Sequence, residues 1–197
     1  MFKILNNYFL LLDETSLCED FKKMLLHGTN HDLILKVCDE ELRVHKDVLS
    51  ARSHVFKSML NSDMKEKNSG IIDIPDCDPE AMKQFLCYIY TGKVESFEER
   101  NMLELYYIAD KYDMKRLRGK CCAFIKRSLS YTNICDVLEL ALNHTDSSLL
   151  EHATEYFMEN ALDIMRTAEW QIFMKDKSTV ANELTIKAFE KVKNTKA

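Results

Sequence analysis

Glycine and proline are scarce in this chain. Its 197 residues include only 4 glycines and 2 prolines, whereas average usage of about 7% Gly and about 5% Pro would give roughly 24. This shortage excludes collagen-like sequence, Pro/Gly-rich disorder and flexible linkers. It also argues against a glycine-rich phosphate-binding loop. Long helices joined by short turns are favoured instead.

Positive charge and long apolar runs are also lacking. The net charge of −5 is opposite in sign to that of most nucleic-acid-binding domains, so no nucleic-acid partner is expected. No stretch approaches 18 uninterrupted apolar residues, so no membrane span is expected. Residues 1–12 (MFKILNNYFLLL) weakly resemble a signal peptide. Because Asn6 and Asn7 interrupt the apolar run and no small-residue cleavage site follows, secretion is disfavoured.

The cysteine and histidine patterns provide no cofactor site. The seven cysteines are an odd number without a C-x-x-C motif, so most are expected to be small core side chains of a reduced protein in the nucleus or cytoplasm. His27 and His31 lie four residues apart, but Gly28 and Asn30 break any helix between them. No cysteine stands close enough in sequence to complete a zinc site, so neither a metal nor a cofactor is expected.

Catalytic signatures are missing as well. The sequence contains no G-x-S-x-G, Walker loop, H-E-x-x-H or EF-hand loop, which are the common local marks of catalytic or metal sites. The basic run 115–120 lacks interleaved aromatic residues and is interpreted as the solvated face of a helix. Adjacent Cys121 and Cys122 would point about 100° apart on a helix, which favours a core role over a redox pair. A non-enzymatic binding module is therefore expected.

The hydrophobic pattern places strands in the first half and helices throughout. Strands are predicted at 31–37, 41–45 and 71–74. A hairpin turn is predicted at Asp39–Glu40, and two short helices that break near Ser53 follow the second strand. Together these elements predict an α+β, predominantly helical chain, in which an α+β domain precedes a smaller all-helical one.

Cap signals mark several helix ends. Asp78 followed by Pro79 predicts a helix start, and Gly92 predicts its end. Ser148 with Glu151 forms a capping-box pattern that predicts the start of a later helix. Further helices are predicted within 17–26, 100–111, 113–129, 160–175 and 178–192.

Two features invite interaction with a partner. Leu17, Phe21 and Met24 form an apolar helical stripe that precedes the first strand. This stripe packs on its own domain or forms a dimer surface, and both interpretations stay open. In a polar loop, Met64-Lys65-Glu66 places an apolar residue two positions from a carboxylate. This second signal is weak by itself, because methionine is common in surface loops.

Four segments are specific in combination. They are HDLILKV (31–37), VHKDVLSARSHVFKSML (44–60), IIDIPDCDPEAMKQFLCYIYTGKV (71–94) and YYIADKYDMKRLRGKC (106–121). Together they resemble a BTB (POZ) domain, and within that family most of all the speckle-type POZ protein group. The likeness continues through 135–171, which resembles that group's shortened BACK (3-box) segment. The implied fold is a small sheet flanked by helices, followed by an all-α BACK-like segment.

The resemblance also implies domain boundaries. An N-terminal segment would cover 1–16, the BTB/POZ domain 17–129, the BACK-like helical domain 130–192 and a tail 193–197. Members of the group carry a MATH domain ahead of the BTB domain, and 16 residues are too few for one. Three alternatives therefore stay open: a short adaptor that captures targets through other surfaces, a MATH-less chain that pairs with full-length relatives, and an incomplete gene sequence.

The function implied by the resemblance is that of a non-catalytic adaptor. Such proteins dimerise through the BTB domain, as homodimers or with related BTB chains, and bind cullin-3 in a ubiquitin ligase complex that promotes protein ubiquitination. By position, Leu17, Phe21, Met24 and Val48 fall where the group buries its dimer contacts. All four are apolar, as a symmetric hydrophobic interface requires.

Cullin binding is assigned by the resemblance to one short motif. Met64 and Glu66 fall on the family's apolar-x-Glu pattern. Met64 would fill an apolar pocket, and Glu66 would orient the loop by hydrogen bonding. The competing hypothesis is a BTB scaffold or corepressor platform, which uses the same dimer stripe and binds no cullin.

Overall fold

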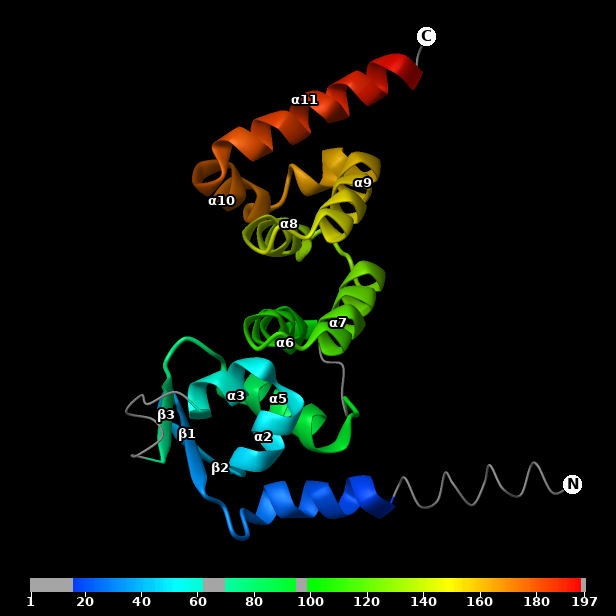
Figure 1. Ribbon diagram of the computed structural model, residues 1–197. Coiled ribbons are helices and arrows are strands. Elements are labelled where there is room, and N and C mark those ends of the chain that lie inside the picture. Colours follow the sequence, from blue (N-terminus) through cyan, green and yellow to red (C-terminus); the bar gives the residue numbers. More distant parts are fainter. Residues whose placement is uncertain (1–15, 62–69, 95–98, 196–197) are drawn as a thin grey trace, which may run out of the picture. The chain divides into compact units, whose positions relative to one another are not determined.

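The computed structural model of the protein describes residues 16–61, 70–94 and 99–195. The chain divides into two compact units, Met1–Gly119 and Lys120–Ala197 (Figure 1). The first begins with a helix over 16–27. It continues with β1 (Leu33–Val37), β2 (Glu40–Val44), α2 (Lys46–Arg52), α3 (His54–Asn61), β3 (Ile71–Ile74), α5 (Pro79–Thr91), α6 (Glu99–Lys111) and the start of α7 (Lys115–Arg127). The predicted N-terminal segment, 1–16, lies almost entirely outside the described residues.

The described sheet has three strands in the order β2-β1-β3. β1 pairs antiparallel with β2 and parallel with β3. Alternate side chains of β1 are buried because successive residues of a strand point to opposite faces. The turn between β1 and β2 is Cys38-Asp39, so the predicted turn at Asp39–Glu40 is wrong by one residue. Glu40 already pairs with Val37, and Cys38 supplies the positive φ, 51°, that a two-residue hairpin turn requires.

An aromatic stack joins three helical segments of the first unit. Phe56 of α3 stacks on Tyr112, which follows α6, with ring centroids 4.3 Å apart and planes 3° from parallel. Phe85 of α5 packs against the same Tyr112 ring at 5.4 Å. Phe56, Phe85 and Tyr112 are all buried, so this stack belongs to the core of the first unit. The predicted break near Ser53 is confirmed, because α2 ends at Arg52 and α3 begins at His54.

The caps of α5 follow the sequence signals. The Asp78 carboxylate accepts a hydrogen bond from the Ala81 backbone N–H at 2.9 Å, and Pro79 takes the first helical position. Gly92 ends the helix with φ 71°, and its N–H donates to the Tyr88 carbonyl at 2.8 Å. Both predicted ends of α5 are confirmed, so the helix runs from Pro79 to Thr91.

The second unit is helical. After the remainder of α7 it contains α8 (Ile134–Asn143), α9 (Ser147–Ile164), α10 (Ala168–Asp176) and α11 (Ser178–Thr195). Trp170 is buried between Phe157 and Phe173, with ring centroids at 4.7 and 5.5 Å. The predicted predominantly helical α+β class, with a small sheet flanked by helices and a helical segment after it, is therefore confirmed. Among the described residues, no helix combines the length and the apolar character needed to span a membrane.

The start of α9 corrects one prediction. Ser148 was expected to cap this helix with Glu151, but the N-cap is Asp146, whose carboxylate accepts from the Leu149 N–H at 3.0 Å. The Ser148 hydroxyl instead accepts a hydrogen bond from the Lys126 ammonium group at 2.8 Å. An aspartate two residues earlier therefore satisfies the free N–H groups and displaces the capping box.

Replacing the two candidate cap residues tests this assignment. We expect Asp146→Ala to lower the free energy of unfolding by about 1 kcal/mol, because a first-turn N–H loses its acceptor. Ser148→Ala, the matched control, should change it by less than about 0.5 kcal/mol. Denaturant unfolding followed by the fluorescence of Trp170, the single tryptophan, measures both. Equal effects, or a larger effect of Ser148→Ala, would contradict the assignment.

Candidate interaction surface

An apolar groove of about 460 Å³ runs between the 16–27 helix, α2 and the end of α5. Its lining residues are Leu17, Cys18, Phe21, Asp47, Val48, Ala51, Arg52, Ile89, Tyr90, Thr91 and Gly92. Three of the four predicted dimer residues, Leu17, Phe21 and Val48, therefore meet in one place. Met24 lies on the same helix, half-buried, but does not line the groove. Leu17 is 60% exposed, while Phe21 and Val48 are half-buried.

The walls of the apolar groove are tied together at the carbonyl end of α5. The Cys18 thiol donates a hydrogen bond to the Thr91 carbonyl at 3.2 Å, which links the 16–27 helix to α5. From α2, the Arg52 side-chain Nε–H donates to the Ile89 carbonyl at 3.0 Å. The last carbonyls of a helix lack partners within it and carry partial negative charge, so a thiol and a cation are suitable donors here. These contacts hold the three walls in register.

A hydrogen-bond network with His45 holds Tyr90, which lines the same groove. The Tyr90 hydroxyl oxygen accepts from the His45 backbone N–H at 2.9 Å and lies 2.8 Å from the His45 Nδ1. The His45 Nε2 lies 2.8 Å from the Thr29 carbonyl, which can only accept. Nε2 therefore carries the proton, and Nδ1 accepts the Tyr90 O–H. Burial raises the pKa of the Tyr90 phenol to about 12, although the His45 N–H opposes this rise.

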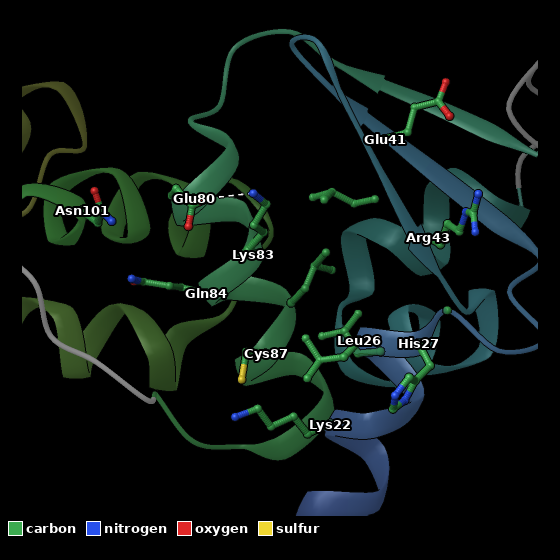
Figure 2. A pocket seen from close by; sticks show the side chains of 14 residues that line it. Lys22, Leu26, His27, Glu41, Arg43, Glu80, Lys83, Gln84, Cys87 and Asn101 are labelled. Carbon is green, nitrogen blue, oxygen red and sulfur yellow. Dashed lines mark hydrogen bonds and ion pairs between the residues drawn. The ribbon is translucent and has the colours of Figure 1, made fainter.

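A second, polar-rimmed groove of about 620 Å³ is formed by the 16–27 helix, β2 and α5 (Figure 2). Leu26, 70% exposed, lines it. On its rim the Lys83 ammonium group pairs with the Glu80 carboxylate at 2.6 Å and the Glu40 carboxylate at 2.8 Å. Gln84 lines it too, and its side-chain oxygen is buried without a hydrogen-bond partner among the described residues. None of the predicted dimer residues lies here.

Leu26 and the polar-rimmed groove were missed at the sequence level. The helical spacing of Leu17, Phe21, Met24 and Leu25 identifies one stripe, and Leu26 falls outside it. Leu25 lines the polar-rimmed groove beside Leu26. The position of Leu26 outside the stripe indicates a second apolar contact of this helix. Only the position of β2 in the structure shows that this contact is the polar-rimmed groove.

Met64 and Glu66 lie outside the described residues. His27 and His31 each bond a backbone carbonyl through Nδ1, that of Lys23 at 2.8 Å and that of Gly28 at 3.0 Å. Across 16–61, 70–94 and 99–195, no group of three or more His, Cys, Asp or Glu side chains could hold a metal ion.

Comparison with known proteins identifies the first unit. A family model of the BTB/POZ domain matches residues 21–129. The chain belongs to the BTB/POZ domain family. The BTB/POZ domain is a protein-interaction module, and most of the apolar groove lies within the matched residues.

Two curated mouse proteins are similar to this BTB/POZ chain. TD and POZ domain-containing protein 4 is 34% identical over 140 residues, which are 71% of this chain and 38% of that protein. TD and POZ domain-containing protein 5 is 31% identical over 160 residues, which are 81% of this chain and 47% of that protein. The chain thus spans less than half the length of these two relatives.

The Tyr90–His45 network yields a pH-dependent prediction. At pH 8 we expect Tyr90→Phe to lower the free energy of unfolding by about 1–2 kcal/mol, because the half-buried His45 backbone N–H and Nδ1 lose their partner. A raised phenol pKa stabilises the fold fully below the unfolded value of about 10, and this contribution fades as the pH rises towards about 12. The difference between wild type and variant should therefore narrow between pH 8 and pH 11.

Denaturant unfolding followed by circular dichroism at both pH values measures this difference. Tyr131→Phe is the matched control, because Tyr131 is 41% exposed and its hydroxyl makes an exposed hydrogen bond, to the Asn160 side-chain oxygen at 3.3 Å. Its effect should stay below about 0.5 kcal/mol. A Tyr90→Phe difference that is constant or grows with pH would contradict the proposed role of burial.

Proposed function

We propose that this BTB/POZ protein is a non-catalytic adaptor that dimerises through the apolar groove and recruits cullin-3 to promote ubiquitination of bound partners. The observation that carries the proposal is the apolar groove itself. Leu17 stands 60% exposed at its edge, and Phe21 and Val48 line it. An exposed leucine and a half-buried phenylalanine beside an apolar hollow mark an interaction site more than a solvated surface.

A two-fold axis through this region explains how the groove is filled. In an isologous interface the same patch occurs on both subunits, so a residue that protrudes from one copy enters the hollow of the other. Leu17 provides the protruding side chain, while Ala51 leaves space opposite the 16–27 helix. Asp47 and Arg52 add charged groups to an otherwise apolar lining, which matches the polar rim of protein interfaces. Met24 would add its half-buried side chain at the margin.

The cullin-binding part of the proposal rests on the motif at Met64 and Glu66. In sequence, the motif lies between the end of α3 and the start of β3, so it belongs to the BTB/POZ domain. An apolar side chain that enters a partner's pocket is the usual energetic centre of an interface. A carboxylate two residues later suits a loop-orienting role.

The second unit completes the proposal. We assign its helices α8–α11 to a BACK-like segment of the speckle-type POZ group, which extends the adaptor beyond the BTB/POZ domain with boundaries near 130 and 192. The seven free thiols suit the reducing conditions of the nucleus or cytoplasm, where this adaptor would act.

Charge reversal at the apolar groove tests dimerisation. We expect the wild type to be a dimer at micromolar concentration and Leu17→Asp with Phe21→Asp to be a monomer of 23.1 kDa, because two carboxylates per chain would be buried without partners. Leu26→Asp is the matched control, since Leu26 lies on the same helix but lines the other groove. Light scattering coupled to size-exclusion chromatography gives the mass.

The Leu26→Asp control must remain a dimer. Circular dichroism must show that all variants are folded. A monomeric wild type would overturn the dimer. A double variant that stays dimeric while folded would move the interface away from the apolar groove.

Cullin binding is tested with three substitutions. We expect Met64→Ala with Glu66→Ala to weaken binding to the amino-terminal domain of cullin-3 by about 30-fold or more, because the anchor and the loop contact are both lost. Lys65→Ala should bind like wild type, since the apolar-x-Glu pattern leaves the middle position free. Isothermal titration calorimetry measures all three.

The cullin test also separates the alternative function. A wild type that dimerises but binds cullin-3 no better than the double variant would favour a BTB scaffold or corepressor platform without a ligase role. If the variant that carries Met64→Ala and Glu66→Ala still dimerises, its loss of cullin-3 binding does not come from misfolding.

A further inference from the structure

Two cysteines meet at one edge of the sheet. β1 and β3 are parallel neighbours, and their last residues, Val37 and Ile74, are paired in the register. Parallel strands that are neighbours lie about 4.8 Å apart and leave the sheet at the same edge. Cys38 follows β1 directly, and Cys77 follows β3 by three residues, so the topology brings two thiols that are distant in sequence to the same place.

The Cys38 side chain reaches across this edge. Its thiol is exposed and lies 3.5 Å from the Cys77 carbonyl oxygen and 3.6 Å from the Pro75 carbonyl oxygen. The backbone at Cys38 is left-handed, with φ 51°, a conformation that glycine, asparagine and aspartate adopt more readily. A cysteine therefore occupies a strained turn position with its thiol directed at the backbone of the second cysteine.

Cys77 is held on a fixed platform. It is 3% exposed and directly precedes Asp78, the cap of α5. The carboxylate of neighbouring Asp76 receives two hydrogen bonds of 2.6 Å from the Lys111 ammonium group and one of 2.8 Å from the Tyr107 hydroxyl. These contacts anchor the loop to α6, so the Cys77 backbone stays beside the turn that carries Cys38.

We propose that Cys38 and Cys77 are an oxidation site that forms an intramolecular disulfide by exchange with a small-molecule disulfide of the glutathione type. The Cys38 sulfur already lies 3.5 Å from the Cys77 carbonyl oxygen, so the bond would join two residues that are neighbours in the fold. This inference is independent of the proposed dimer and of cullin binding.

The exchange balances in two steps. The Cys38 thiolate attacks one sulfur of glutathione disulfide, forms a mixed disulfide and releases one glutathione thiolate. The Cys77 thiolate then attacks the Cys38 sulfur, forms the protein disulfide and releases the second glutathione. The two protein thiols lose two protons and two electrons, which reduce one glutathione disulfide to two glutathione thiols.

Exposure sets the order of the two steps. Cys38 is exposed and meets the reagent first, whereas Cys77 is buried. Burial raises the pKa of the Cys77 thiol to about 11, although the Lys111 ammonium group nearby opposes the rise. Cys77 is thus a poor first nucleophile and acts as the resolving thiol once the mixed disulfide is placed beside it.

The bond would tie the β1–β2 turn to the start of α5. The loop that it closes runs from Cys38 to Cys77 and contains β2, α2, α3 and β3. Cross-links across loops of this length restrict the unfolded chain strongly, so the oxidised first unit should melt on the order of 10 °C higher than the reduced one.

The test uses the full chain in buffers of defined glutathione and glutathione disulfide content, followed by alkylation, non-reducing digestion and mass spectrometry. We expect a Cys38–Cys77 cross-linked peptide in the wild type. Cys77→Ala should trap glutathione on Cys38, and Cys38→Ser should leave Cys77 unmodified. Cys122→Ser, a half-buried cysteine of α7, is the matched control and should still form the cross-link.

Three results would overturn the proposal. Glutathione that remains on Cys38 of the wild type without cross-linking would show that Cys77 cannot resolve it. The same mixture of cross-links in urea-unfolded and folded protein would show that the fold does not select this pair. An oxidised protein that melts below the reduced one would show that the native geometry does not accommodate the bond. Circular dichroism of each variant confirms that the comparison is made on folded chains.

Discussion

The hydroxyl of Ser53 is the contact on which the apolar groove depends. Ser53 is the one polar residue that is buried in the part of the chain that the structure describes. Its oxygen accepts from the Phe56 N–H at 3.4 Å, and its hydroxyl donates to the Tyr112 carbonyl at 2.8 Å. The Ser53 backbone N–H ends α2 by donating to the Leu49 carbonyl, while its side chain caps α3 and ties it to Tyr112, which follows α6. The stack of Phe56 on Tyr112 then seals this junction from water.

The hydrogen bonds of Ser53 fix the position of α2, and α2 in turn forms one wall of the apolar groove. Because α2 is fixed at Ser53, Val48 and Ala51 face the 16–27 helix, and Arg52 reaches the carbonyl end of α5. The apolar groove is therefore assembled from three segments, each held by a contact to backbone carbonyls. A protein interface needs such rigid walls, because ordering loose side chains on association costs free energy.

Periodicity and caps predicted most of the local structure, and tertiary placement decided the rest. β3, the cap at Asp78, the end at Gly92 and the break near Ser53 follow from local rules. The turn at Cys38 was missed because cysteine gives no signal for positive φ, and nearby Asp39 does. Met24 shares the stripe of Leu17 and Phe21, but the groove is bounded by α2 and α5, whose positions no helical period contains. The cullin motif remains a prediction.

The central place of β1 has a consequence for the order of folding. β1 meets β2 across a two-residue turn, but it meets β3 only after the chain has passed through α2 and α3. Hairpins form within microseconds, whereas pairing of distant strands must first overcome the entropy of closing a long loop. During synthesis, the hairpin can therefore form before Tyr112 has been made and can stack on Phe56. Until then, the sheet has an exposed edge and the apolar side chains of α2 and α3 are exposed, and this is the stage at which chaperones can bind the nascent chain most readily.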